Sequence, residues 1–291
     1  MGATQAIAAT ATTTRVNVRQ GAPNTKAPVL RKLDSGVPVN VVGVTTGENI
    51  QGNSVWYEID ANAYIWSGGC APLSASLPPP SASEAPNVVD ISHGDQVADF
   101  SQARAAGLIG VIHKATTGGT GRDDLYATRR ALAAKAGLLW GAYHWGTAAP
   151  VDQQIQNFLG AASPDANTLV ALDFESDPGN QMTLDMARQF LQGIQDKLNR
   201  HAVLYSGNLI KDQLGSTKDS FFGAHRLWLA QYGPTPKVQA SWNTFWLWQY
   251  TDGTDRTPKV TVPGIPGDAK GSLDCDHFMG SEALLREQWA S

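Results

Sequence analysis

The chain has 291 residues, of which 42% are hydrophobic and 16% charged, and its formal net charge is −4 at pH 7. This composition is ordinary for a globular protein, and the length allows one large domain or two domains with a sizeable core. The negative charge excludes a general electrostatic attraction to nucleic acid or anionic lipid. No uninterrupted apolar run approaches membrane-spanning length, so we expect a soluble chain with neither nucleic acid nor membrane as a partner.

The first residues, MGATQAIAATATTT, are mostly small and contain neither a basic segment nor a strong apolar core. They lack the features of a clear signal peptide. Residues 1–12 are therefore predicted to form an N-terminal tail. Export would need a signal that has been removed, or another route of release.

Short β-rich segments follow in residues 13–73: Arg15–Arg19, Pro38–Val44 and Val55–Ile59. Alternating apolar residues, punctuated by glycine, asparagine and proline, predict a small all-β barrel or sandwich.

Residues 74–86 are rich in proline, serine and alanine. Such a segment cannot build a core and is typical of a semi-rigid spacer. It predicts a linker between the small β-rich domain and a larger domain of residues 87–291.

Apolar strand segments alternate with helical patterns along residues 87–291. The predicted strands are Val88–Ile91, Gly110–His113, Leu139–Tyr143, Thr168–Asp173, Ala202–Tyr205, Leu227–Ala230 and Phe245–Trp248. The predicted helices lie near Phe100–Ala106, Tyr126–Ala136, Asp152–Ala161 and Leu184–Asn199. This alternation over roughly 200 residues predicts an α/β domain with a parallel sheet closed into a TIM-like (β/α) barrel. The helical signal fades after about Tyr205, so we expect an irregular second half.

Acidic residues lie where strands of such a barrel end, which is where functional side chains gather. Asp90 ends the first predicted strand, and Asp173 ends the fourth, with Glu175 two residues on. Near the C-terminus, the segment SLDCDHF supplies Asp274 and Asp276.

The spacing of Asp173 and Glu175 points both side chains to the same face, about 7 Å apart along a strand. Two carboxylates at this range raise each other's proton affinity, which favours one protonated acid and one ionised partner. Glycoside hydrolysis requires this arrangement. The alternative is an acidic pair in a solvated turn. Asp90, delivered by another strand, favours a catalytic site.

Several tryptophans and tyrosines lie beside the predicted strand ends: Trp140, Tyr143, Trp145, Tyr205, Trp228, Tyr232, Trp246, Trp248 and Tyr250. A glycan cleft uses such rings as platforms for the apolar faces of sugars, whereas other rings fill the barrel core. Tyr143, at the end of its strand, favours the cleft. Trp246 and Trp248 fit either place equally well.

Metal or cofactor chemistry finds no support in the sequence. Four histidines, His93, His113, His144 and His277, are scattered without ligand spacing, and we expect His93 and His144 to orient their neighbours through hydrogen bonds. There is no P-loop, dinucleotide fingerprint or nucleophile elbow. The two cysteines, Cys70 and Cys275, form no framework and are predicted to be free buried thiols.

Taken together, residues 88–278 resemble glycoside hydrolase family 25, the muramidases often called Chalaropsis-type lysozymes. The motifs that carry the resemblance occur in order: VDISH at 89–93, VIHKAT at 111–116, AGL at 136–138, GAYH at 141–144, LDFE at 172–175, WLAQY at 228–232, WQY at 248–250, and LD with a following Phe at 273–278. Each motif alone is weak, but all of them in register form a specific pattern.

The resemblance implies cleavage of the β-1,4 bond between N-acetylmuramic acid and N-acetylglucosamine in peptidoglycan glycan strands, without a cofactor. It implies that Glu175 is the general acid and Asp173 its paired carboxylate, which would position the substrate acetamido group. Asp90 and Asp274 match two further acids of the cleft. The expected substrate-binding residues are Tyr143, Lys114, Trp228 and Gln249, to which the position of Tyr205 beside a strand end adds a fifth.

The sequence departs from the family where Thr117-Gly-Gly follows the KAT motif, since a glutamate is usual there. This segment borders the expected cleft, so preference for glycan or stem peptide is open. The N-terminal domain resembles bacterial SH3-like domains, on VNVR at 16–19, VWYEI at 55–59 and AYIW at 63–66. The resemblance implies a cell-wall anchor that binds wall peptide. A structural appendage is the alternative.

Two other functions compete with a muramidase. A chitinase-like glycosidase would also carry a D-x-E pair, but Thr168 and Ala171 occupy the positions of the earlier acids in its longer motif. A non-catalytic wall-binding protein has no need for four acids at one rim. We expect a monomer that acts on the bacterial cell wall after secretion, in the periplasm or after release by a phage. Lysin, autolysin and antibacterial toxin remain equally compatible, as do retention and inversion at the anomeric carbon.

Overall fold

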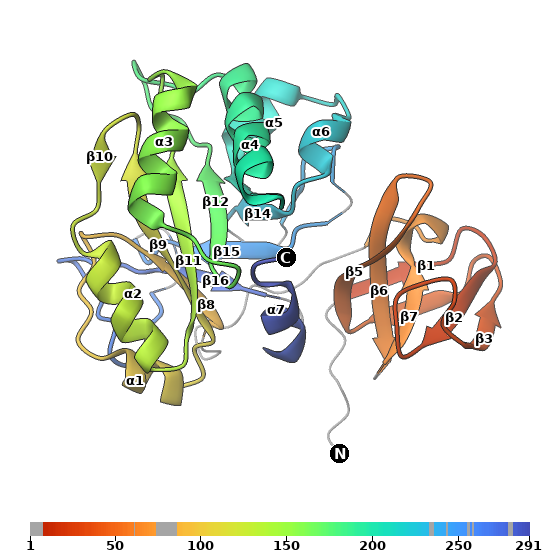
Figure 1. Cartoon of the computed structure of the whole chain (residues 1–291). Coiled ribbons are helices and arrows are strands. Elements are labelled where there is room, and N and C mark those ends of the chain that lie inside the picture. The colour runs from red at the N-terminus through yellow and green to blue at the C-terminus, as the bar shows by residue number, and fades with distance from the viewer. Residues whose placement is uncertain are drawn as a thin grey trace. The chain divides into compact units, whose positions relative to one another are not determined.

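The computed structural model describes residues 8–60, 62–73, 86–232, 236–242, 244–254, 257, 259–278 and 282–291. They form two compact units (Figure 1), one of residues 8–73 with 282–284 and one of residues 86–278 with 285–291. The predicted linker, residues 74–86, lies outside the described residues apart from Pro86.

The first unit is an all-β structure. Its strands are β1 (Ala8–Ala11), β2 (Val16–Gln20), β3 (Val29–Leu33), β4 (Pro38–Val41), β5 (Gly43–Ile50), β6 (Asn53–Asp60) and β7 (Ala63–Trp66), and a 3₁₀ turn, η1 (Ser67–Gly69), follows them. Five strands form an antiparallel sheet in the order β3-β2-β7-β6-β5, and β1 pairs with β4. Alternate residues such as Val18, Val41 and Ile65 are fully buried in one core, as the period-2 pattern predicted.

Two strands of this unit were not predicted. Strand β1 lies within the segment expected to be a tail, so that expectation was wrong for residues 8–11, which pair along their length with β4. Strand β3 is largely exposed. Strand β3 therefore shows no alternation of buried and exposed positions, and its backbone pairing with β2 holds it in place.

The second unit is a mixed α/β fold around an eight-stranded barrel. The barrel strands are β8 (Val88–Ile91), β9 (Gly110–Thr117), β11 (Leu139–Trp145), β12 (Leu169–Asp173), β13 (Val203–Ser206), β14 (Leu227–Ala230), β15 (Leu247–Thr251) and β16 (Asp274–His277). They neighbour one another in this order, and β8 pairs with both β16 and β9, which closes the barrel. A short strand, β10 (Gly121–Arg122), folds back onto β9.

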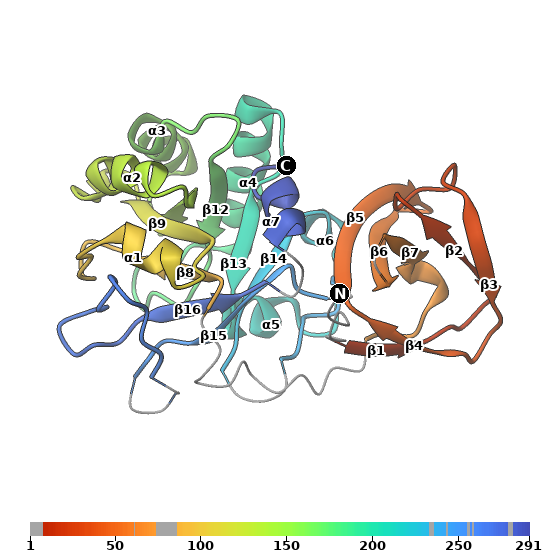
Figure 2. The same ribbon diagram turned by 90° about the horizontal axis from the view of Figure 1, so that it is seen from below.

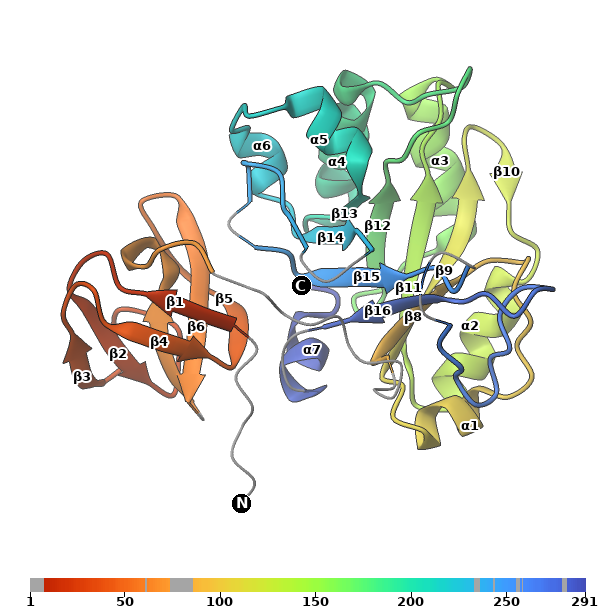
Figure 3. The same cartoon turned by 180° about the vertical axis from the view of Figure 1, so that it is seen from behind.

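The strands β8 to β15 run parallel, and β16 runs antiparallel to both of its neighbours, β15 and β8 (Figure 3). Every residue of β8, β12, β13 and β15 is buried. Continuous apolar runs are expected where both faces of a strand are covered, and this is why the sequence revealed most of these strands. Two predictions need correction: β15 begins at Leu247 rather than Phe245, and β16 was not predicted as a strand.

The helices of the described residues are concentrated in the first half of the barrel, where they cover its outside (Figure 2). They are α1 (Phe100–Ala105), α2 (Tyr126–Lys135), α3 (Val151–Ala162), α4 (Leu184–Leu198), α5 (Asn208–Leu214), α6 (Ser220–Gly223) and α7 (Glu282–Gln288). The four helices predicted from the sequence correspond to α1 to α4. Side chains of Asp99 and Thr183 accept hydrogen bonds from the first turns of α1 and α4 and so fix where these helices begin. After β13 only the short α5, α6 and α7 occur in the described residues, so the second half is irregular, as expected.

Candidate active site

The barrel brings the four predicted acids to one rim. Asp90 is the third residue of β8, Asp173 is the last residue of β12, and Glu175 follows two residues later. Because β16 runs antiparallel, its first residue, Asp274, reaches the carboxyl ends of the parallel strands and lies opposite Asp90. The local fold therefore brings four acids from three strands together in one cluster.

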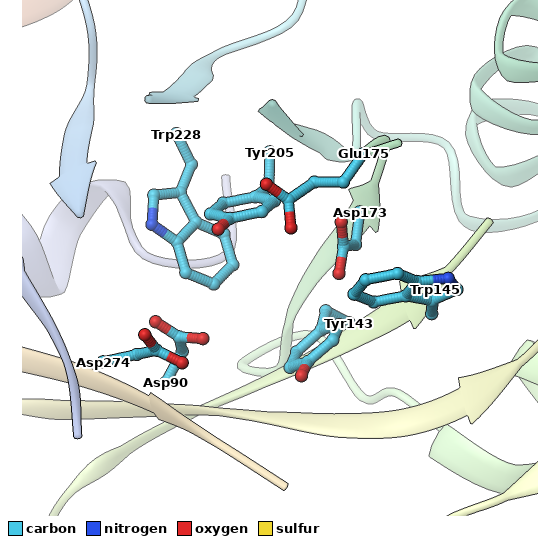
Figure 4. A pocket seen from close by; sticks show the side chains of 8 residues that line it. All are labelled: Asp90, Tyr143, Trp145, Asp173, Glu175, Tyr205, Trp228 and Asp274. Carbon is cyan, nitrogen blue, oxygen red and sulfur yellow. The ribbon is translucent and has the colours of Figure 1, made fainter. Parts of the chain in front are cut away.

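A pocket opens at this rim, and Figure 4 shows the side chains that line it: Asp90, Tyr143, Trp145, Asp173, Glu175, Tyr205, Trp228 and Asp274. Asp90 and Asp274 lie together on one side, while Asp173 and Glu175 lie on the other. Aromatic rings stand around both pairs. All four residues predicted as catalytic therefore line one pocket.

Asp173 is buried, Glu175 is half-buried, and the charge of Glu175 acts on Asp173. Burial raises the pKa of Glu175, and the contact with the Tyr205 hydroxyl opposes this effect. Burial, followed by the charges of Glu175 and Asp90, raises the pKa of Asp173 well above its usual value. One Asp173 oxygen, Oδ1, has no hydrogen-bond partner within the described residues. The pair holds protons readily, and Asp173 keeps a free acceptor toward the pocket.

The opposite pair, Asp90 and Asp274, is also buried. Burial is the largest cause of the raised pKa of each, and the neighbouring carboxyls add to it: Asp276 for Asp90, and Asp90 for Asp274. Many carboxyls in one poorly solvated place cannot all ionise easily. Folding alone gives no reason for such a cluster.

Lys114 does not line the pocket, but it lies next to a residue that does. Its Nζ is 5.8 Å from the ring centroid of Trp145, and its positive charge lowers the pKa of Asp173. Trp145 was noted in the sequence only as one of many aromatics, although the last position of β11 signals the rim. Thr117, the exposed departure from the family motif, lies opposite Trp145 in the strand pairing.

Gln249 is buried and connects three side chains. Its Oε1 accepts hydrogen bonds from the hydroxyls of Tyr205 (2.9 Å) and Tyr232 (3.0 Å), and its Nε2 donates to Asp90 Oδ2 (2.8 Å). It does not line the pocket. It holds two residues that do line the pocket, Asp90 and Tyr205, and its contact with substrate stays a prediction.

Trp228 is a wall of the pocket whose orientation is fixed from behind. Its Nε1 donates to Asp276 Oδ1 at 2.6 Å. Its ring centroid is 4.5 Å from that of Tyr205, edge to face, and 6.4 Å from that of Tyr143. Asp276 was not among the predicted site residues, although its alternation with Asp274 on one strand was a signal that both side chains point to the same face.

The remaining aromatics are structural. Trp248 is fully buried and donates to the backbone of Gln231, and Trp246 donates to Gln288 Oε1. Trp140 packs against His113. None of these three tryptophans lines the pocket. Trp246 and Trp248, which the sequence placed equally well in the cleft or in the core, therefore lie away from the cleft.

His144, between Tyr143 and Trp145 on β11, is held by polar neighbours. Its ring nitrogens lie 2.7 Å from Thr116 Oγ1 and 3.0 Å from Gln154 Oε1, and burial lowers its pKa to about 4. His93 contacts Asp123 at 3.1 Å near the surface. Hydrogen bonds of the expected kind thus surround both histidines.

Both cysteines are free, Cys275 buried and Cys70 half-buried. Within the described residues, no group of three or more histidines, cysteines or acids has the geometry to hold a metal ion. In the same part of the chain, no helix is both long enough and apolar enough to cross a membrane.

The geometry suits cleavage of a glycosidic bond. A carboxylic acid with a raised pKa beside a second carboxylate can give a proton to a leaving oxygen. The second carboxylate stabilises the developing positive charge on the sugar. The rings of Tyr143, Trp145 and Trp228 offer apolar surfaces to sugar faces.

Comparison with known proteins agrees with this chemistry. The model of the family described as glycosyl hydrolases family 25 matches residues 89–257, all within the second unit. Lysozyme M1 of Streptomyces globisporus is 26% identical over 212 residues, which are 68% of this chain and 69% of that protein.

Solved structures give the same result for the fold. The bacterial lysozyme of Streptomyces coelicolor superposes with a TM-score of 0.62 at 25% identity, covering 72% of this chain and 98% of its own. A family GH25 lysozyme from Aspergillus fumigatus superposes with a TM-score of 0.57 at 25% identity, covering 70% and 98%. The resemblance found in the sequence is thereby confirmed for the second unit.

Proposed function

Because the chain belongs to family 25 of the glycosyl hydrolases and is therefore a glycoside hydrolase, we propose that it is a muramidase. It cleaves the β-1,4 bond between N-acetylmuramic acid and N-acetylglucosamine in bacterial peptidoglycan. The observation that carries the proposal is the pocket in which Asp173 and Glu175 face Asp90 and Asp274 between aromatic rings.

Glu175 is the general acid in this proposal. It lies beyond the end of β12 and is only half-buried, so a leaving-group oxygen can reach it, and burial keeps its pKa raised. Asp173 lies deeper, where burial and the charge of Glu175 raise its pKa, while the charge of Lys114 opposes them and favours the ionised form. The two carboxyls therefore differ in environment, as an acid and its ionised partner must.

Asp173 also supports participation of the substrate. Its unpartnered Oδ1 can accept a hydrogen bond from the acetamido N–H of the sugar, so that the acetamido oxygen attacks the anomeric carbon as Glu175 protonates the leaving oxygen. This route retains the anomeric configuration, whereas direct attack by water inverts it. The anomer of the first product, followed by NMR, distinguishes the two.

The barrel fits a variant of the TIM-like (β/α) barrel in which the last strand is reversed. For the first unit we propose an SH3-like fold that binds wall peptide and keeps a monomeric enzyme at the cell wall. Its five-stranded antiparallel sheet around Val18, Val41 and Ile65 supports this proposal. Tethering raises the enzyme's local concentration on the polymer.

Product analysis on purified peptidoglycan tests the function. We expect the wild type to release muropeptides with reducing N-acetylmuramic acid ends, and Glu175→Gln to lower the rate by about a hundredfold or more. Glu287→Gln, the same change at an exposed position, is the matched control. Reducing N-acetylglucosamine ends, or no soluble product from several wall types, would contradict the proposal.

Binding of the whole chain tests the first unit. The Glu175→Gln protein is mixed with intact peptidoglycan and with glycan from which an amidase has removed the stem peptides, and the pelleted fraction is measured. We expect binding to weaken without stem peptides. Equal binding to both would leave the first unit as a structural appendage.

A further inference from the structure

Asp276 lies behind the pocket, where nothing in the proposed reaction requires an acid. It is fully buried, and its Oδ1 accepts the Trp228 indole N–H at 2.6 Å. Its Oδ2 finds no N–H or hydroxyl partner within the described residues. The carboxyl lies within hydrogen-bonding reach of Asp90. Because ionised carboxylates only accept hydrogen bonds, this contact requires one proton between the two acids.

The contact closes a ring of side chains. Asp90 Oδ2 accepts from Gln249 Nε2 at 2.8 Å, and Gln249 Oε1 accepts from Tyr205 at 2.9 Å. Tyr205 packs edge to face on Trp228 with centroids 4.5 Å apart, and Trp228 returns to Asp276. We call these five residues the Asp276 ring. Three of them, Asp90, Tyr205 and Trp228, present surfaces to the pocket.

We propose that Asp276 is a positioning residue that shares one proton with Asp90 and so holds Trp228 and Tyr205 as a preformed wall for the sugar. The proposal rests on the muramidase function and assigns the two acid pairs different tasks. Asp173 and Glu175 carry out the chemistry, while Asp90 acts as a neutral donor to Asp276.

The surrounding charges agree with a retained proton. Asp90 is buried beside the carboxyls of Asp276 and Asp95, and its pKa is raised. Asp274 and Cys275 precede Asp276 on β16. The charges named as acting on the two acids are those of other carboxyls, so removing the proton would place two negative charges side by side.

Kinetics on soluble glycan fragments test whether Asp276 positions the pocket wall that Trp228 and Tyr205 form. Asp276→Leu keeps the size but removes both acceptors, and we expect KM to rise about tenfold with a smaller change in kcat, since a sugar-binding surface rather than the acid is disturbed. Asp276→Asn keeps an acceptor for Trp228 and offers an amide N–H to Asp90. It is expected to stay within about threefold of wild type. Asp124→Asn, at an exposed position, controls for the loss of a charge.

A double-mutant cycle separates positioning from a general loss of packing. Trp228→Phe removes the donor to Asp276, so Asp276→Leu is expected to add little to the KM change of Trp228→Phe. Additive effects would contradict action through Trp228. Melting temperatures of all variants show which of them remain folded.

Two spectroscopic readouts do not depend on activity. The Trp228 indole N–H resonance, assigned by its loss in Trp228→Phe with Trp246→Phe as control, is expected to move upfield in Asp276→Leu and less in Asp276→Asn. The infrared difference spectrum of wild type minus Asp90→Asn at pH 7 is expected to show the band of a protonated carboxylic acid. Absence of that band, or an indole resonance unmoved by Asp276→Leu, would overturn the proposal. Failure of the proposed catalytic acid instead appears as activity retained in Glu175→Gln.

Discussion

Asp274 lies opposite Asp90 in the antiparallel pairing of β16 with β8, so residues 184 positions apart in sequence face the same pocket. The reversal of β16 makes this possible, because a parallel last strand would carry its first residue to the far end of the barrel. Burial raises the pKa of both carboxyls, and the charge of Asp90 raises that of Asp274 further. The site therefore stores unfavourable electrostatic energy in the folded state.

Neutralising Asp274 is expected to stabilise the protein at neutral pH. A folded-state pKa above the unfolded value makes ionisation unfavourable in the native protein, so stability falls as pH rises through the folded pKa. Asp274→Asn removes that loss. We expect a gain of about 1 kcal/mol, or roughly 2–4 °C in Tm, at pH 7.

The gain should vanish near pH 3, where both states bind the proton. Thermal melts of wild type and Asp274→Asn at the two pH values measure it. Backbone hydrogen bonds lower the pKa of Asp268, so Asp268→Asn should instead lose stability at pH 7. A gain that is the same at both pH values would indicate better packing rather than relief of charge.

The pH profile of kcat/KM should depend on Tyr205. Contact with the Tyr205 hydroxyl lowers the pKa of Glu175, in opposition to burial, so Tyr205→Phe should raise that pKa. If Glu175 must be protonated to act, activity is lost as pH rises through its pKa, and the alkaline limb should move to higher pH.

Tyr232→Phe is the matched control for this prediction. Tyr232 also donates to Gln249 Oε1, so its loss disturbs the same amide without removing a contact to Glu175. We expect the alkaline limb to stay in place in this variant. An equal displacement in both variants would assign the effect to Gln249 instead of Glu175.

The sequence was sufficient to predict the strands whose burial requires a continuous run of apolar residues. The strands β8, β12 and β14 were predicted because continuous apolar runs are needed when both faces are covered, and Asp173 and Glu175 follow from where such a run ends. Strand β16, DCDH, has no apolar run, and its position depends on pairing with β15 and β8. Local sequence cannot show a partner so distant.

The same limit explains why the sequence did not show what two buried residues connect. Gln249 is a neutral side chain in a buried strand, and only the three-dimensional arrangement of Tyr205, Tyr232 and Asp90 reveals what it connects. Asp276 was visible as an acid but not as the partner of Trp228. Positioning residues leave weaker sequence signals than the residues they hold, because their partners come from other strands.

Lys114 should set the acid limb of the profile. Its charge lowers the pKa of Asp173, so Lys114→Met should raise that pKa and leave a smaller ionised fraction at low pH. Activity that needs ionised Asp173 rises with pH through this pKa, and the acid limb should move to higher pH. Lys114→Arg keeps the charge and should move it much less. The measurement is the pH profile of kcat/KM for wild type, Lys114→Met and Lys114→Arg. An acid limb that does not move in Lys114→Met would show that the charge of Lys114 does not set the pKa of Asp173.

Gln154 should be needed to keep the end of β11 in place. It is fully buried and uses both ends of its amide: Oε1 accepts from the Thr147 backbone N–H and contacts His144, while Nε2 donates to the carbonyls of Thr147 and Ala149. Gln154→Leu has similar size but leaves these groups unpaired in a buried place, which we expect to cost about 2–4 kcal/mol of unfolding free energy. Gln153→Leu, at the exposed neighbouring position, is the control and should change stability by less than about 0.5 kcal/mol.

Since Tyr143 and Trp145 flank His144 on β11, kcat/KM of the folded Gln154→Leu protein should fall as well. Urea unfolding of the three proteins gives the free energies, and a loss of stability with unchanged kcat/KM would show that the end of β11 keeps its place without this amide.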